Sequence, residues 1–379
     1  MKIIKKAGCF FINLKDKKIA LVLRREDYSF PKGHLEKNET IKECAIRETI
    51  EETGHEVQII GDEISVIKYE SSAGENVENH LFLGIDIGIT DRKIEEKDKE
   101  KIEWFDINEV EEKLSYQNLK DIWKLVKPKI EKIFNNVELD IIVSKEDKYY
   151  YSYIRLKGEN YLPTNIYCIE DLNLNNIKKY NFENHIIYFQ CNIPLNVKVI
   201  YELKDINCYI VNKEFYEHNY TKLEVQKILD NNKIDIPKIS KIDSLKKISY
   251  PIFCKENSHV GINLIAYSEN TLIKFFSKFD ISDFYCEEVI KDGNEMKLYC
   301  IKNEIYDSNK SKQNKELKQL FNKISKILNL EVYSVDIIKK DTKNIIVDIN
   351  PNSGYFGSNI ARKEFFKFIN NSISDIIGL

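Results

Sequence analysis

Residues 33–54, GHLEKNETIKECAIRETIEETG, constrain the fold of this chain more than any other stretch. Their pattern predicts a helix over residues 40–53, with Asn38 or Thr40 as the N-cap and Gly54 as the C-terminal stop. The Pro-Lys-Gly sequence at residues 31–33 predicts a turn that leads into this helix. The stretch therefore predicts one short helix that is entered from a tight loop.

The predicted helix has two different faces. The face that can pack on a core consists of Ile41, Cys44, Ala45 and Thr49. Another face carries glutamates at the spacing i, i+3, i+4, namely Glu48, Glu51 and Glu52. These carboxylates repel one another unless a cation neutralises them, and their oxygen atoms suit Mg²⁺ or Mn²⁺, ions that also bind phosphate. The alternative is a solvated acidic face, which is how most charge runs are interpreted.

The stretch resembles the Nudix box of the pyrophosphohydrolases. The spacing G-x5-E-x7-R-E-x2-E-E-x-G is filled by Gly33, Glu39, Arg47, Glu48, Glu51, Glu52 and Gly54. This resemblance implies a Nudix α/β/α sandwich over residues 1–135 that hydrolyses a diphosphate linkage. It also implies metal ligands and orienting residues: the metal is held by Glu48, Glu51, Glu52 and the backbone carbonyl of Lys32, and Arg47 and Glu39 orient the carboxylates. Thr49 and His55 depart from the pattern, because both positions are usually aliphatic.

The surroundings of the box refine this expectation. The segment FPKGHLEKNE resembles the corresponding segment of enzymes that act on diadenosine polyphosphates and, less closely, of enzymes that act on inositol pyrophosphates. A Trp-containing strand at residues 102–105 and a closing helix over 106–114 are expected to complete the sandwich, and residues 121–134 predict an amphipathic helix. A further base or metal ligand is expected among four glutamates that the sequence does not rank: Glu95, Glu96, Glu100 and Glu103. A domain that senses a nucleotide without hydrolysing it is the alternative, but the intact box glutamates argue against it.

Most of the chain after residue 220 resembles the ATP-grasp superfamily. Residues 138–215 alternate strands and helices, as in α/β domains, and are expected to precede an ATP-grasp nucleotide-binding region over residues 216–379. The resemblance rests on residues 220–223, 250–255, 258–262, 284–290, 333–338 and 346–355. It implies an α+β module that uses ATP as a co-substrate.

The resemblance also implies roles for individual residues. Lys222 and Lys255 would grip ATP phosphates together with the loop that contains Ser258 and Gly261. Glu287 and Glu288 lie in the strand expected to hold adenine, Glu295 is expected at the ribose, and Lys297 at a phosphate or an anionic substrate. Side chains two residues apart on a strand share a face, so Asp336, Asp348 and Asn350 are expected to hold the Mg²⁺ of ATP. The alternative is a pair of acidic hairpin ends.

The reaction of this module stays open at this point. The Ser-x-Val-Gly-Ile loop and the Asp-Ile-Asn-Pro-Asn-Ser-Gly run resemble ligases of the D-alanine:D-alanine and glutamate-ligase type. The turn at residues 354–357, GYFG, is closer to inositol phosphate kinases. In the kinase case the two sites could act in opposite directions on one pyrophosphorylated metabolite. A degenerate, non-catalytic module is a further alternative.

Composition limits the remaining possibilities. A chain of 379 residues predicts two or three domains, and its formal net charge of -3 gives no indication of nucleic-acid or membrane-surface binding. The eight cysteines include no C-x-x-C pair, which indicates reduced core residues of a cytoplasmic protein. No segment has the length of a membrane span. The sequence thus predicts a bifunctional cytoplasmic enzyme that uses Mg²⁺ or Mn²⁺, ATP and small phosphorylated substrates, and it makes no prediction of the oligomeric state.

Overall fold

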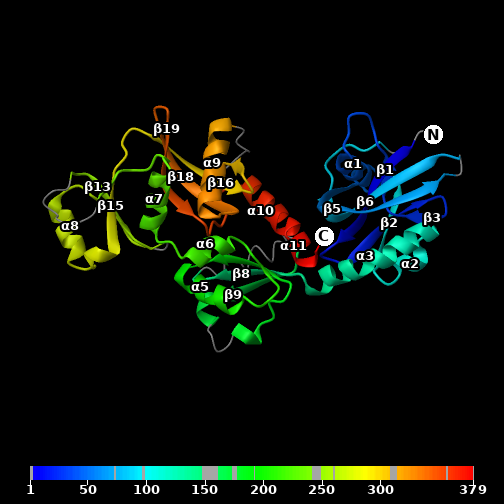
Figure 1. Cartoon of the computed structure of the whole chain (residues 1–379), viewed down its shortest axis with the longest axis horizontal. Coiled ribbons are helices and arrows are strands. Elements are labelled where there is room, and N and C mark those ends of the chain that lie inside the picture. Colours follow the sequence, from blue (N-terminus) through cyan, green and yellow to red (C-terminus); the bar gives the residue numbers. More distant parts are fainter. Residues whose placement is uncertain are drawn as a thin grey trace.

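The computed structural model of the chain describes residues 3–71, 74–95, 99–146, 161–172, 177–191, 193–240, 249–258, 261–307, 314–355 and 357–378. An N-terminal domain lies at one end of the long axis, and a small sheet with helix α8 (Glu269–Phe276) lies at the other (Figure 1). Helices α10 (Asn359–Asn371) and α11 (Ile373–Ile377), near the end of the chain, run back towards the N-terminal domain. The molecule is therefore elongated, with different sheets at its two ends.

The N-terminal domain is built on a seven-stranded sheet. Its main path has the order β3-β2-β1-β6-β5, while β4 pairs with β1 and β7 pairs with β2. Strands β1 and β6 run parallel to each other, and the other pairs are antiparallel. The strands are β1 (Ile4–Asn13), β2 (Lys18–Arg24), β3 (Asp27–Ser29), β4 (Lys32–His34), β5 (His55–Glu70), β6 (Asn76–Ile89) and β7 (Lys101–Asp106).

Helices cover both faces of this sheet. Helix α1 (Ile41–Thr53) packs its buried Cys44 and Ala45 into a cluster with Ala7 and Cys9 of β1. Helix α3 (Gln117–Asn136) covers the other face, where buried Trp123 belongs to a cluster with alternate β1 residues. Successive β1 side chains point to opposite faces, so one strand serves both clusters. The predicted α/β/α sandwich is confirmed.

The closing helix differs from the prediction. Residues 106–114 form only the single turn α2 (Val110–Lys113), and α3 closes the sandwich instead. Helix α3 is longer than the predicted amphipathic segment, and its buried residues recur at helical spacing as Leu119, Trp123, Val126, Ile130 and Ile133. This apolar stripe gives α3 the area needed to cover the sheet, which the short α2 lacks.

A parallel sheet follows the sandwich. Its order is β11-β10-β8-β9, and every pair in it is parallel. The elements are β8 (Leu139–Val143), β9 (Thr164–Cys168), β10 (Ile186–Gln190), β11 (Tyr209–Ile210), α5 (Ile193–Glu202), α6 (Lys213–His218) and two 3₁₀ turns, Ile169–Asp171 and Ile177–Lys179. Ile141 and Ile142 of β8 belong to two different core clusters, so this sheet lies between two cores.

Two antiparallel sheets complete the chain. The outer sheet has the order β12-β15-β13-β14, and the inner one has the order β17-β16-β18-β19. The outer elements are β12 (Ile239–Ser240), β13 (Ile252–Glu256), β14 (Asn263–Ala266), β15 (Phe284–Glu288), α8 and the 3₁₀ turn Ile281–Asp283. The inner elements are β16 (Asn294–Ile301), β17 (Glu304–Tyr306), β18 (Val332–Lys340) and β19 (Lys343–Asn350), with α7 (Lys222–Asn231) and α9 (Lys315–Leu328). Asp336 lies within β18, and Asn350 is the last residue of β19.

The N-terminal and C-terminal parts are in contact. One continuous apolar cluster includes Trp123 of α3, Ile186 of β10 and Phe365 of α10. In addition, the Gln58 side-chain amide of β5 donates a hydrogen bond to the Lys367 carbonyl at 2.7 Å. No helix in the described part of the chain combines the length and the apolar character that a membrane span needs.

Candidate functional sites

The helix that carries the box glutamates is fixed at both ends. Thr40 is its N-cap: the Thr40 hydroxyl accepts from the Glu43 backbone N–H at 3.2 Å, and the Glu43 carboxylate accepts from the Thr40 N–H at 2.8 Å. At the other end Gly54 has a φ of 74° and donates its N–H to the Ile50 carbonyl at 2.8 Å. The N-cap is thus Thr40 and not Asn38.

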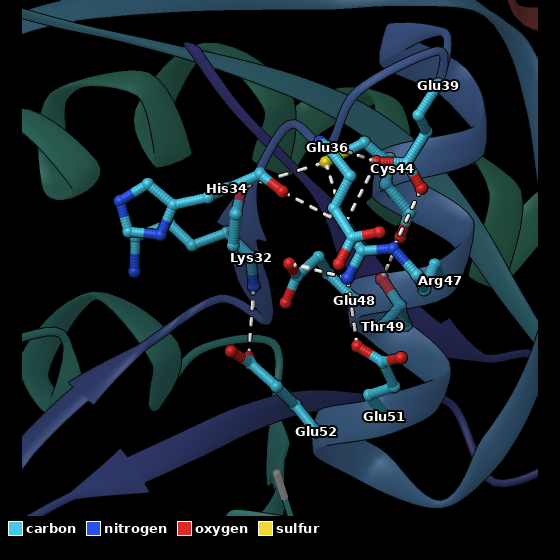
Figure 2. Close-up of polar contacts among 12 residues, drawn as sticks. Lys32, His34, Glu36, Glu39, Cys44, Arg47, Glu48, Thr49, Glu51 and Glu52 are labelled. Carbon is cyan, nitrogen blue, oxygen red and sulfur yellow. Dashed lines mark hydrogen bonds and ion pairs between the residues drawn. The ribbon is translucent and has the colours of Figure 1, made fainter. Parts of the chain in front are cut away.

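Arg47 connects the predicted metal ligands (Figure 2). Its guanidinium donates to both carboxylate oxygens of Glu39, at 2.8 and 2.9 Å, to Glu48 at 2.8 Å and to Glu51 at 2.9 Å. It also donates to the His34 carbonyl at 2.9 Å, which ties α1 to β4. The hydrogen bonds from Arg47 to Glu39, and after them the one from the Glu36 backbone N–H, lower the pKa of Glu39. Arg47 therefore fixes the relative positions of the carboxylates, as expected from the box.

Gly33 lies close to the Glu48 carboxylate. A Cβ atom at residue 33 would lie 2.0 Å from the Glu48 carboxylate carbon, so Glu48 would have to leave the position in which Arg47 holds it. Burial raises the pKa of Glu48, although the hydrogen bond from Arg47 opposes this shift. The loop and the helix thus bring a partly buried carboxylate against a backbone segment without a side chain.

Glu52 is almost completely enclosed. Its carboxylate accepts from the Lys32 backbone N–H at 3.0 Å and from the Arg24 guanidinium at the end of β2. Arg24 also donates from Nε to Glu100 at 2.9 Å, and the Glu100 backbone N–H donates to the Glu52 carbonyl at 3.1 Å. Among the described residues, Glu100 is therefore the one of the four candidate glutamates that the structure brings to the box. Of the others, Glu103 bonds Tyr28 and Lys101, Glu95 is exposed, and Glu96 lies outside the described residues.

A cavity of about 550 Å³ adjoins this cluster. It shares Arg24 and Lys32 with the carboxylate site, and its other lining residues are Lys6, Ile67, Tyr69, Glu70, Ser71, Asn79, Tyr116, Asn118 and Leu119. Burial lowers the pKa of Lys32 to about 7 and also lowers that of Lys6. The buried Oδ1 atom of Asn79 has no hydrogen-bond partner within the described residues. The cavity is thus basic on the side of the glutamates and holds an unused acceptor.

In the C-terminal part, Lys255 and Glu287 form a buried ion pair. The Lys255 ammonium lies 2.7 Å from the Glu287 carboxylate and donates to the Val347 carbonyl at 2.6 Å, which joins the outer sheet to β19. The second carboxylate oxygen of Glu287, Oε1, is buried and has no partner in the described part of the chain. Burial raises the pKa of Glu287, and the nearby Lys255 charge opposes this rise.

The predicted magnesium ligands lie together on the inner sheet. Asp336 and Asp348 face each other directly across the β18–β19 ladder, and Asn350 is next on the same face of β19. Lys297 lies 3.4 Å from Asp336, and Lys222 lies 3.4 Å from Asp348. Burial raises the pKa of Asp336, with Lys297 acting in the opposite direction. Residues from α7, β16, β18 and β19 therefore meet at one place.

A cavity of about 450 Å³ lies between the outer and inner sheets. Its lining includes Glu287, Glu288, Glu295, Lys297 and Asp336. A second cavity of about 410 Å³ shares Glu295, Met296 and Lys297 with it and continues to Tyr299, Asp307 and Gly357.

Two groups of predicted residues lie outside the lining of these cavities. The first group does not line the first cavity but lies next to it through ion pairs or strand pairing: Lys222, Lys255, Asp348 and Asn350. The second group is Ser258 and Gly261, which flank residues 259–260. Residues 259–260, and Phe356 of the GYFG turn, lie outside the described residues.

Comparison with known proteins bears on both parts. The family model of the NUDIX domain matches residues 3–125. These residues form a NUDIX domain. No curated protein sequence matches the chain.

Solved structures are similar to each part separately. A NUDIX hydrolase from Nitrosomonas europaea is 23% identical, with a TM-score of 0.29, over 32% of this chain and 87% of that one. An Ap4A hydrolase from C. elegans is 21% identical, with a TM-score of 0.28, over 32% and 95%. A D-alanine–D-alanine ligase from Bacillus anthracis is 17% identical, with a TM-score of 0.46, over 64% of this chain and 95% of that one. The family model thus confirms the resemblance stated from the sequence for the N-terminal part.

The residues of the NUDIX domain fit a divalent cation. The groups around Gly33 and Glu52 offer several oxygen donors: the carboxylates of Glu48, Glu51, Glu52 and Glu100 and the Lys32 carbonyl. Such a set suits Mg²⁺ or Mn²⁺ better than a softer metal.

Sequence reasoning missed three residues of this NUDIX domain: Lys6, Arg24 and Asn79. They lie on β1, β2 and β6, outside any motif, and only the pairing of Lys6 with Asn79 across β1 and β6 brings them together.

Proposed function

We propose that the NUDIX domain is a Mg²⁺- or Mn²⁺-dependent hydrolase of a nucleoside polyphosphate anhydride. One observation carries this proposal: the glutamate cluster opens, through the shared residues Arg24 and Lys32, on a basic cavity. A phosphoanhydride could then place its phosphates beside both the metal ligands and the cationic side chains.

The lining supports a nucleoside substrate over an inositol pyrophosphate. Its cations are Lys6, Arg24 and Lys32, which is too few to balance a fully phosphorylated inositol ring. Tyr69 and Tyr116 offer rings against which a base can stack, and the free Asn79 oxygen can accept from an amino or hydroxyl group. A nucleoside supplies both an aromatic ring and hydrogen-bond donors.

The chain's own residues have separable roles in this hydrolysis. A divalent metal bound by the oxygen donors would polarise the anhydride and lower the pKa of a bound water. A box carboxylate that does not bind the metal would accept the proton of that water. Arg47 orients Glu48 and Glu51, while Lys6, Arg24 and Lys32 offset the charge of the phosphates.

The test is a substrate panel of dinucleoside polyphosphates, nucleoside triphosphates and diphosphoinositol phosphates, with release of monophosphate or phosphate measured. We expect turnover of nucleoside substrates and its loss in Glu52→Gln. Asn79→Ala should raise KM and change kcat little. Turnover confined to the inositol compounds would contradict the assignment of the cavity.

For the C-terminal part we propose Mg²⁺-ATP-dependent coupling of a carboxylate to an amine. Glu287 lines the first cavity, and its buried Oε1 atom, which has no hydrogen-bond partner among the described residues, is suited to accept from the amino group of adenine. Asp336, Asp348 and Asn350 offer oxygen ligands for Mg²⁺. Lys222 and Lys297, each beside one of these acids, are suited to contact phosphates.

The second cavity favours the ligase over the kinase. Its charged residues are Glu295, Lys297 and Asp307, so carboxylates outnumber cations. An amino acid or another small amine can match this arrangement, whereas an inositol phosphate would meet two like charges.

The experiment gives the Glu52→Gln protein Mg²⁺-ATP with amino-acid pairs and, separately, with inositol phosphates. We expect ADP release that depends on an amine acceptor. Accumulation of a pyrophosphorylated inositol, which the wild type then consumes, would support the opposing-activities alternative instead.

A further inference from the structure

Arg24 contacts three groups that belong to the candidate metal site. Its guanidinium bonds the Glu52 carboxylate, donates from Nη2 to the Lys32 carbonyl at 3.4 Å and donates from Nε to Glu100 at 2.9 Å. The same side chain lines the 550 Å³ cavity. Arg24 therefore lies between the metal ligands and the place where the substrate phosphates are proposed to bind.

The second arginine of the site is held differently. Arg47 donates to Glu39, Glu48, Glu51 and the His34 carbonyl, and its side chain is 22% exposed. Arg24 is 42% exposed, and it lines the cavity, which Arg47 does not. Both arginines bond candidate metal ligands, but Arg47 has more acceptors and is less exposed, so Arg24 is the one that can exchange its partners.

A guanidinium and a divalent cation that both lie close to one carboxylate repel each other, and solvent screens this repulsion only weakly at Glu52, because that residue is 2% exposed. A guanidinium released from Glu52 would find phosphate oxygens in the adjoining cavity, which it can bind in a bidentate manner.

We propose that Arg24 is a positioning residue that competes with the divalent cation for Glu52 and binds a substrate phosphate when the cation holds Glu52. This inference rests on the proposed hydrolase function. It predicts that metal and substrate each favour the binding of the other, since a cation on Glu52 frees Arg24 for the phosphate.

A purely supporting role for Arg24 predicts the opposite sign. If Arg24 only held Glu52 in position, its removal would disorder a ligand and weaken metal binding. If it competes, its removal strengthens metal binding. The direction of the change therefore separates the two roles.

The test is a Mn²⁺ titration of the full chain, with free Mn²⁺ followed by electron paramagnetic resonance. Glu52→Gln defines the component that belongs to the NUDIX site and separates it from Mn²⁺ bound elsewhere. Arg24→Gln should bind this component about threefold to tenfold more tightly, the scale of a partly exposed charge pair. Arg25→Gln is the matched control: it removes the same charge from the next, exposed residue and should have little effect. In the Glu52→Gln background, Arg24→Gln should no longer change Mn²⁺ binding.

A second readout follows the phosphate. Arg24→Gln should raise KM for the hydrolysed nucleotide about tenfold with a smaller change in kcat, and Arg24→Lys should restore part of the affinity. Unchanged or weaker Mn²⁺ binding in Arg24→Gln overturns the role of Arg24 while the metal site stands. Identical Mn²⁺ binding by wild type and Glu52→Gln overturns the metal site itself, and with it the proposed function.

Discussion

The two candidate sites hold their acidic residues in opposite ways. In the NUDIX domain, Arg47 alone bonds three glutamates that lie within 13 residues of one another in the sequence, all of them on α1 or the loop before it. In the C-terminal part each acid has its own lysine from a distant segment: Glu287 has Lys255, Asp336 has Lys297 and Asp348 has Lys222. The first site is organised by local sequence, and the second by tertiary folding.

This difference predicts different responses to substitution. Removing one of the glutamates bonded to Arg47 leaves the other two bonded to it, so chemistry should suffer more than stability. Removing one lysine of the C-terminal pairs leaves a single unpaired acid, so stability should suffer where that acid is buried.

The largest effect is expected at Glu52. Glu52→Gln keeps the size of the side chain and removes one charge from the metal ligands, so hydrolytic turnover should fall about a hundredfold to a thousandfold. Thermal stability should be unchanged or higher, because the enclosed carboxylate no longer has to be desolvated. The ATP-dependent reaction serves as the internal control and should keep its rate. Unchanged turnover on a confirmed substrate would remove Glu52 from the reaction.

The second-largest effect is expected at the buried ion pair of Lys255 and Glu287 in the C-terminal part. Lys255→Met should lower the free energy of unfolding by about 3 kcal/mol at neutral pH, because Glu287 stays behind as an unpaired charge. Without Lys255, burial raises the pKa of Glu287 further, so the folded state binds a proton that the unfolded state lacks. Stability of the variant should therefore fall as the pH rises from about 5 to about 8, above the usual carboxyl pKa.

Chemical denaturation at several pH values measures this dependence. Adding Glu287→Gln to Lys255→Met should recover much of the loss and remove its pH dependence. A deficit that is the same at all pH values would show that lost packing, and not charge, is responsible.

A smaller effect is expected at Arg47. Arg47→Lys keeps the charge but cannot bond several carboxylates at once, so Mn²⁺ affinity of the NUDIX site should fall about tenfold. Arg92→Lys is a matched control, because Arg92 is a surface residue paired with Glu56. Equal Mn²⁺ affinities for Arg47→Lys and wild type would mean that the glutamates need no common partner.

The same comparison explains what could be predicted from the sequence. The box helix, its cap at Thr40 and its stop at Gly54 follow from contiguous residues, and the structure has them where expected. The pairing of Asp336 with Asp348 follows from the two-residue period of strands. By contrast, Arg24 and Glu100 meet Glu52 only because β2 pairs with β7 and the chain before β7 returns to α1. No local pattern encodes such a meeting.

The residues that line the cavities could not be predicted from the sequence either. The lining of the 550 Å³ cavity comes from β1, β2, β4, β5, β6 and the start of α3, so its shape depends on the whole sandwich. Asn79 illustrates this point: in the sequence it is one polar residue of an alternating strand, and only burial makes its free oxygen informative.

The smallest effects test whether the two parts unfold together. Both contain a helix with the same capping arrangement, in which Thr40 pairs with Glu43 and Thr221 pairs with Glu224. Thr40→Ala and Thr221→Ala should each cost about 1 kcal/mol. One apolar cluster runs from α3 through the parallel sheet to α10, and the other face of that sheet packs on the core that contains α7. Because these two clusters connect the NUDIX domain with the C-terminal part, we expect a single calorimetric transition. Each substitution should then lower the same midpoint by about one degree.

Thr342→Ala, at an exposed turn between β18 and β19, is the control and should leave the midpoint unchanged. Two transitions, of which Thr40→Ala shifts one and Thr221→Ala the other, would mean that the sandwich and the C-terminal part are stable separately. In that case the contact between β5 and α10 would hold together two independently folded parts, and the local and tertiary organisation of the two sites would reflect two separate folding units.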